Sequence, residues 1–97
     1  MEYQQHNPPH PGEFIRTVYL EPLKLSANEV SKKLGVHSST FGRLVSEKSD
    51  VSAEMAIKLE AVLGRSAESW LLMQDQYDLA NIRRAVDVSG LTAINFR

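Results

Sequence analysis

The chain has 97 residues, no cysteine and a formal net charge of −1, and 42% of its residues are hydrophobic. This length and composition fit one globular domain, and the absence of cysteine excludes a disulfide scaffold, a thiol nucleophile and a cysteine zinc site. No apolar run is long enough to span a membrane, and the first residues lack the pattern of a signal peptide, so we expect a cytoplasmic protein with no membrane partner.

The first part of the chain predicts a flexible segment followed by one helix. Residues 1–10 are polar and contain two consecutive prolines, so we expect a flexible N-terminal segment. A helix is predicted from Pro11 to about Leu20, because proline suits the first helical turn, where its missing N–H would have no partner. Pro22 is expected to end this helix, since a proline cannot continue the hydrogen-bond ladder.

The next two predicted helices carry the functional signal. Ser26 and Glu29 fit a capping box, Gly35 fits a left-handed C-cap, and a further helix is predicted over residues 38–46. Ser31 is small, as a close approach of two helices requires. The apolar residues that must meet across the turn have the spacing of a helix-turn-helix: Val30, Leu34, Val36, Phe41 and Leu44. A helical hairpin with no DNA-binding role is the alternative.

If this unit binds DNA, residues 38–46 form the recognition helix in the major groove. The candidate DNA-binding residues are polar or basic: Lys32, His37, Ser38, Ser39, Thr40, Arg43, Ser46 and Lys48. Arg43 can make a bidentate contact with guanine, with a phosphate contact or a solvated charge as alternatives. Ser38 is also expected to cap the helix. Gly42 lowers helix stability by about 1 kcal/mol relative to alanine, and either a close approach to DNA or tight packing would account for it.

Charge is distributed unevenly along the chain. Residues 22–49 contain five basic and two acidic residues, so this segment is basic although the whole chain is not. A local basic segment can bind phosphates even when the net charge is near zero. Lys33 in this segment and Arg16 outside it are further candidates for phosphate contacts, with a solvated charge as the alternative for each.

Two more helices are predicted in the second half. Ser52 is expected to cap a helix that ends at Gly64, and Ser66 a helix that extends to about Val88. The expected fold is therefore all-α, with five helices in one domain over residues 11–90 and a C-terminal tail over residues 91–97.

The last predicted helix is apolar on two sides. One stripe contains Trp70, Met73, Tyr77 and Ala80, and the other contains Leu72, Leu79, Ile82 and Val86. The first stripe can pack on the helix-turn-helix core. The second predicts an interface, either with a second copy in a homodimer or with another protein. A bend near Asp78 that folds the tail back over its own domain is the alternative.

Catalysis is not favoured by any residue pattern. His6 and His10 are separated by prolines, and Asp75 and Asp78 have no histidine or cysteine at ligand spacing. We therefore predict no enzymatic activity, no metal site and no cofactor.

Several motifs follow one another in a fixed order over about residues 10–80. They are His10-Pro11-Gly12-Glu13, Leu20-Glu21-Pro22-Leu23, Leu25-Ser26, Leu34-Gly35-Val36, Ala56-Ile57-Lys58-Leu59, Leu63-Gly64, Ser66-Ala67-Glu68-Ser69-Trp70-Leu71, Leu72-Met73-Gln74 and Tyr77-Asp78-Leu79. This order resembles the HigA antitoxin family, also known as virulence-associated protein I, in the lambda-repressor-like helix-turn-helix superfamily. Relative to that family, Ala27 replaces a glutamine, and Glu47 and Asp50 add negative charge after the recognition helix. Both differences are expected to weaken DNA binding.

The resemblance implies a function that composition and spacing do not. It implies an antitoxin that neutralises a HigB-type mRNA endonuclease toxin, binds its own operator DNA as a dimer and represses its operon. A stand-alone helix-turn-helix repressor without a toxin is the alternative. A protein-interaction module that has lost DNA binding is a third hypothesis.

Overall fold

The computed structural model describes residues 7–96 as an all-helical chain with no strand in that range. The helical segments, in chain order, are α1 (Pro11–Ile15), η1 (Arg16–Leu20), α2 (Glu21–Leu23), α3 (Ala27–Leu34), α4 (Ser38–Val45), α5 (Ala53–Leu63) and α6 (Ala67–Ile82). Because α1, η1 and α2 follow one another without interruption, they form one continuous helix, and the described chain has the five helices that the sequence predicts. None of these helices is long and apolar enough to cross a membrane.

The first helix does not end before Pro22, so that prediction is wrong. A π-helical turn precedes the proline, and the Glu21 N–H donates to the Arg16 carbonyl five residues back. This wider turn shifts the hydrogen-bond register just before the proline ring, which would clash with the carbonyl four residues back in a regular α-helix. The helix ends instead at Lys24, which has a left-handed backbone with φ of 54°.

The helix-turn-helix forms as predicted. The Ser26 Oγ accepts from the Glu29 N–H at 3.0 Å, and the Glu29 carboxylate accepts from the Ser26 N–H at 2.9 Å, which completes the capping box of α3. Gly35 ends α3 with φ of 72°, a conformation that side chains disfavour. Ser31 is buried in the contact between α3 and its neighbours, as its small size predicts.

The last two helices begin where the sequence indicates. The hydroxyls of Ser52 and Ser66 cap α5 and α6. However, α6 ends at Ile82 instead of about Val88. Beyond Ile82 every described residue is exposed, so no packing favours further helix, and the Asp87 carboxylate accepts from the Ser89 N–H in a local turn that competes with helix.

Trp70 lies at the centre of the core. Its side chain is fully buried and its Nε1–H donates to the Gly64 carbonyl at 3.0 Å. The Phe14 ring meets it edge to face, with ring centroids 5.8 Å apart. The other buried apolar residues come from all the main helices and, for Val51, from the loop between α4 and α5: Ile15, Leu20, Val30, Leu34, Phe41, Leu44, Val45, Val51, Met55, Ala56, Leu59 and Met73.

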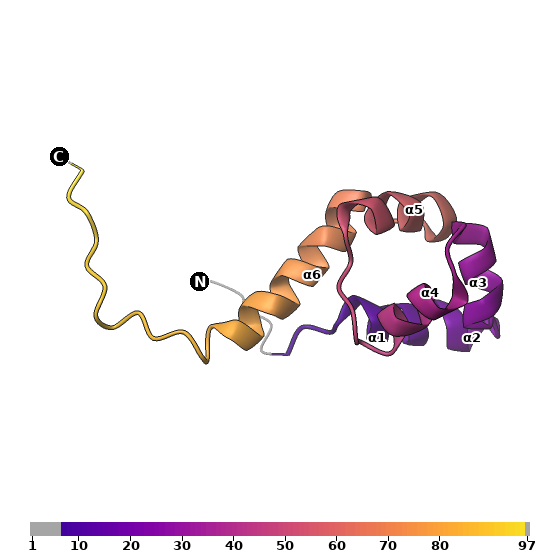
Figure 1. Ribbon diagram of the computed structural model, residues 1–97, viewed down its shortest axis with the longest axis horizontal. Helices are drawn as coiled ribbons and strands as arrows, with labels where there is room; N and C mark the ends of the chain where they lie inside the picture. The colour runs from indigo at the N-terminus through magenta and orange to yellow at the C-terminus, as the bar shows by residue number, and fades with distance from the viewer. Residues whose placement is uncertain (1–6, 97) are drawn as a thin grey trace.

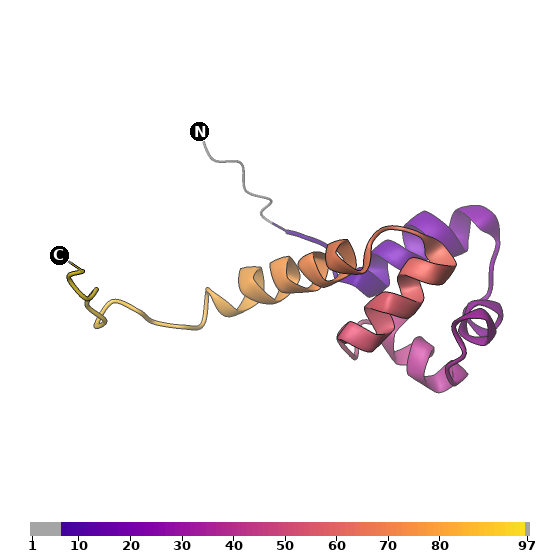
Figure 2. The ribbon, with the colours of Figure 1, turned by 90° about the horizontal axis from the view of Figure 1, so that it is seen from above.

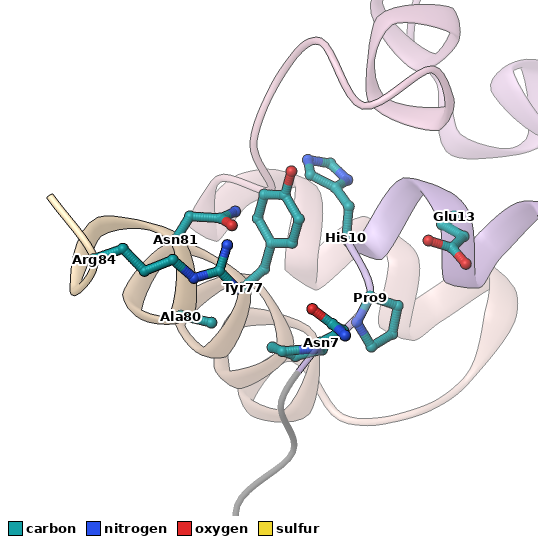
Figure 3. A pocket seen from close by; sticks show the side chains of 9 residues that line it. Asn7, Pro9, His10, Glu13, Tyr77, Ala80, Asn81 and Arg84 are labelled. Carbon is teal, nitrogen blue, oxygen red and sulfur yellow. The ribbon is translucent and has the colours of Figure 1, made fainter.

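The start of the domain includes His10, which the sequence analysis placed in a flexible segment. His10 is 2% exposed, its Nδ1 accepts from the Gly12 N–H at 2.9 Å, and its ring packs edge-on against Tyr77 with centroids 4.9 Å apart (Figure 3). These contacts fix the backbone just before α1. His10 and Tyr77 also line a cavity of about 220 Å³ beside α6. Residues 1–6 of the predicted flexible segment lie outside the described residues.

Gly12 determines how closely the first helix approaches α4. A Cβ at this position would overlap the backbone carbonyl of Leu44. Glycine therefore lets the backbone of α1 rest directly on the backbone of α4, and any side chain here would push α4 away. The first helix and α4 lie side by side in Figure 1.

α6 and the segment that follows it give the molecule an elongated shape. α6 leads away from the body formed by the other helices, and residues 83–96 continue outward from its end (Figures 1 and 2). The expected alternative, a bend near Asp78 that folds the tail back, does not occur, because α6 is continuous through Asp78.

Candidate nucleic-acid interface

α4, the predicted recognition helix, presents a polar face to solvent. α4 buries Phe41, Leu44 and Val45 against the core. The opposite side carries the residues that the sequence predicts for DNA contact, with Ser38, Ser39, Arg43 and Ser46 exposed and Thr40 half-buried. α4 therefore has one face that is buried in the core and one polar face that is exposed to solvent.

The start of α4 differs from the prediction in one detail. His37 is the N-cap residue and makes no side-chain capping bond, whereas Ser38 is already the first helical residue. The prediction that Ser38 caps the helix is therefore wrong. The physical reason is that the chain is still extended at His37, with φ of −66° and ψ of 147°, so the helix begins one residue after it. The side chains of His37 and Ser38 are both exposed at the N-terminal end of α4.

Two lysines flank the recognition helix. Lys32 lies in the last turn of α3, and Lys48 follows α4, where its N–H donates to the Arg43 carbonyl at 2.8 Å. Both side chains are exposed, and neither has an ion-pair partner within residues 7–96. Unpaired exposed ammonium groups can approach phosphates without breaking an existing ion pair.

Arg16 is engaged within its own chain. Its guanidinium donates to the Val45 carbonyl at the end of α4 and forms an ion pair with Glu47 at 3.1 Å. A phosphate contact by Arg16 would have to compete with these bonds and stays a prediction. Glu47 is paired instead of adding a free negative charge beside α4.

Gln74 has a structural role, beside the candidate interface, that the sequence does not predict. Its buried amide accepts from the Val51 N–H at 2.8 Å and donates to the carboxylates of Asp50 at 3.2 Å and Asp78 at 3.0 Å. These bonds attach the loop after the recognition helix to α6, so Asp50 has a structural role. A buried polar residue on an apolar stripe was a signal, but its partner lies 23 residues away and could not be identified from the sequence.

Gly42 occupies the middle of the polar face of α4. A Cβ built on Gly42 has no atom within 4 Å, so packing inside the chain does not require glycine. Its φ is not positive, so the backbone conformation does not require it either. Of the two explanations that the sequence left open, tight packing is excluded.

The second predicted interface lies on α6 and just beyond it. Leu72, Leu79 and Ile82 are exposed on the helix, and Val86 is exposed in the segment that follows, with exposed fractions of 45–56%. The other stripe behaves as predicted, because Trp70 and Met73 are buried. One side of α6 is thus covered by its own domain and the other is uncovered in the monomer.

Comparison with known proteins now identifies the family. The helix-turn-helix family model matches residues 18–70, more than half of the chain. Virulence-associated protein I of Dichelobacter nodosus is 43% identical over 70 residues, which are 72% of this chain and 65% of that protein. Antitoxin HigA-1 of Vibrio cholerae is 32% identical over 83 residues, which are 86% of this chain and 78% of that protein.

The chain belongs to the HigA family of helix-turn-helix antitoxins. This is a DNA-binding family and not a class of enzymes. A solved structure extends the likeness to three dimensions: Pseudomonas aeruginosa antitoxin HigA with the higBA promoter superposes with a TM-score of 0.80 at 31% identity, over 93% of this chain and 98% of that chain. The resemblance to the HigA family that the motifs predict is therefore confirmed, together with the all-α fold.

Proposed function

We propose that this chain is an antitoxin that binds the operator of its own operon through α4 and neutralises a HigB-type mRNA endonuclease toxin. The observation that carries the DNA-binding part is the exposed polar face of α4, with Arg43 on it, mounted on a helix-turn-helix. The solved HigA relative that contains promoter DNA supports it. The toxin-binding part rests on membership of the antitoxin family.

The residues on and beside α4 have three kinds of proposed contact with DNA. Arg43 reads a guanine through two hydrogen bonds, since its guanidinium has the required fork of donors. The hydroxyls of Ser38, Ser39, Thr40 and Ser46 contact base edges or phosphates. Lys32, Lys48 and His37 contact phosphates and set the position of the domain on the duplex.

The exposed stripe of α6 completes the proposal. Leu72, Leu79, Ile82 and Val86 cover the same stripe of a second copy in a two-fold homodimer. A monomer would leave these side chains in water. Two recognition helices about 34–36 Å apart, one turn of DNA, would then read the two halves of a palindrome.

Titration of labelled duplexes tests the DNA-binding part. The wild-type protein is expected to bind the promoter region of its own gene much more tightly than a scrambled duplex of the same composition. For the toxin part, a HigB-type toxin is expressed alone and together with this chain, and co-expression should restore the growth that the toxin alone arrests. Promoter binding without neutralisation would favour a stand-alone repressor, and loss of both would favour a protein-interaction module.

A further inference from the structure

We infer that Gly42 is a specificity-determining residue, because its missing side chain lets the α4 backbone approach the base edges of the major groove. This inference rests on the proposed operator binding and adds the point at which the helix comes nearest to the bases. The ligand is the edge of a base pair, not a phosphate.

The fold of the free chain does not require a glycine at residue 42. Gly42 lies inside α4, where glycine is less stable than alanine because it loses more backbone freedom on folding. No atom lies within 4 Å of a Cβ built there, and the backbone is not in the left-handed region. The folded chain alone would therefore be more stable with alanine at this position.

Gly12, in contrast to Gly42, is a glycine that the fold requires. A Cβ on Gly12 would overlap the Leu44 carbonyl oxygen, which is backbone and cannot move aside. Alanine at residue 12 would therefore displace α1 from α4. The two glycines have opposite surroundings, so they should respond in opposite directions to the same substitution.

Gly42 lies within the polar face of α4. It lies one turn from Ser39 and Ser46 and beside Arg43, all of which are exposed. The Ser46 hydroxyl donates to the Gly42 carbonyl at 2.7 Å, which holds that side chain against the helix backbone. Gly42 thus leaves a gap on the polar face, with the short side chains of Ser39 and Ser46 one turn away and the long side chain of Arg43 beside it.

A gap of this kind matters in the major groove. The groove is about 12 Å wide, and an α-helix with its side chains is about 10–12 Å across. The side chains on the inserted face therefore decide how deeply the helix enters. A residue without a side chain at the centre lets neighbouring side chains such as Arg43 reach the base edges, where sequence is read.

The experiment compares Gly42→Ala and Gly42→Leu with wild type, using the full chain. We expect the thermal unfolding midpoint of Gly42→Ala to rise by about 4 °C or more, whereas Gly12→Ala lowers it. On the promoter duplex, Gly42→Ala should bind about 10-fold more weakly, and Gly42→Leu more weakly still. Binding to the scrambled duplex at low salt should be unchanged, because phosphates supply that affinity.

Matched controls separate the outcomes. Ser39→Ala changes the same face without adding bulk and should cost less promoter affinity than Gly42→Leu. A lower unfolding midpoint for Gly42→Ala, full promoter binding by both variants, or an equal loss on both duplexes would each overturn the inference. If the wild-type protein itself has no preference for the promoter, the proposed function fails, and this inference fails with it.

Discussion

Arg43 and Lys48 are both exposed cations near the recognition helix, yet their proposed contacts differ in kind. A guanidinium can satisfy two acceptors of one guanine at once, whereas an ammonium at the end of a flexible chain acts as a point charge toward phosphate. Both side chains are exposed in the free protein, so replacing either should leave the fold intact.

Arg43→Ala is therefore expected to weaken promoter binding by about 1–3 kcal/mol and to relax the preference at one base pair. Lys48→Ala should weaken binding to all duplexes alike and reduce the salt slope by about one unit. Titration of promoter and scrambled duplexes at several salt concentrations measures both effects. Unchanged promoter binding by Arg43→Ala would contradict the assignment of α4 as the reading helix.

Trp70 on α6 leads to a prediction about stability. Its side chain is fully buried and packs against Phe14, and its Nε1–H donates to the Gly64 carbonyl. Trp70→Ala should cost about 3–5 kcal/mol, a large part of the stability of a small domain. Chemical denaturation provides the measurement, and a loss below about 1 kcal/mol would show that the site tolerates a cavity.

At the level of elements, local signals were predictable and distant contacts were not. The caps at Ser26, Ser52 and Ser66 follow from side chains and backbone groups only three residues apart. The bonds of Gln74 join segments 23 residues apart in the chain, and the π-helical turn before Pro22 is a local change of hydrogen-bond register that no capping or turn motif indicates. The capping motifs could therefore be predicted, whereas the register of the first helix and the attachment of the loop to α6 could not.

Gln74 links α6 to the loop that follows the recognition helix. Gln74→Leu keeps the apolar stem but leaves the Val51 N–H without its partner, which should cost about 1–3 kcal/mol for a buried donor. Gln74→Glu tests the two bonds that the Gln74 amide donates, because a carboxylate there would face Asp50 and Asp78. Like charges at this distance repel, so the loss of stability of Gln74→Glu relative to the wild type should be larger at pH 7 than at pH 4.

Denaturation of both variants at the two pH values measures these effects, and amide hydrogen exchange at Val51 reports the loop directly. Gln74→Leu should show faster exchange at Val51 without loss of helix. Wild-type stability in both variants would contradict the assigned hydrogen bonds.

At the scale of the whole molecule, α6 has two apolar stripes on opposite sides, one buried in the core and one exposed. Periodicity predicted both stripes, and the structure covers one of them with the core of the same chain. Periodicity placed Val86 on the helix, but α6 ends at Ile82, and residues 83–96 beyond it are exposed, so burial does not favour further helix there. The sequence could show that a surface is apolar, but the monomer's fold does not determine which molecule covers it.

The homodimer proposal leads to the final prediction. Two charges on the exposed stripe, in the double variant Leu79→Glu with Ile82→Glu, should give a folded monomer, since burying two carboxylates against a second copy is costly. Both side chains are about half exposed in the free chain, so the helical circular dichroism should be retained. Ile57→Glu is the matched control, because Ile57 is an exposed apolar residue on α5. Light scattering at tens of micromolar measures the mass, and a monomeric wild-type protein there would rule out this interface.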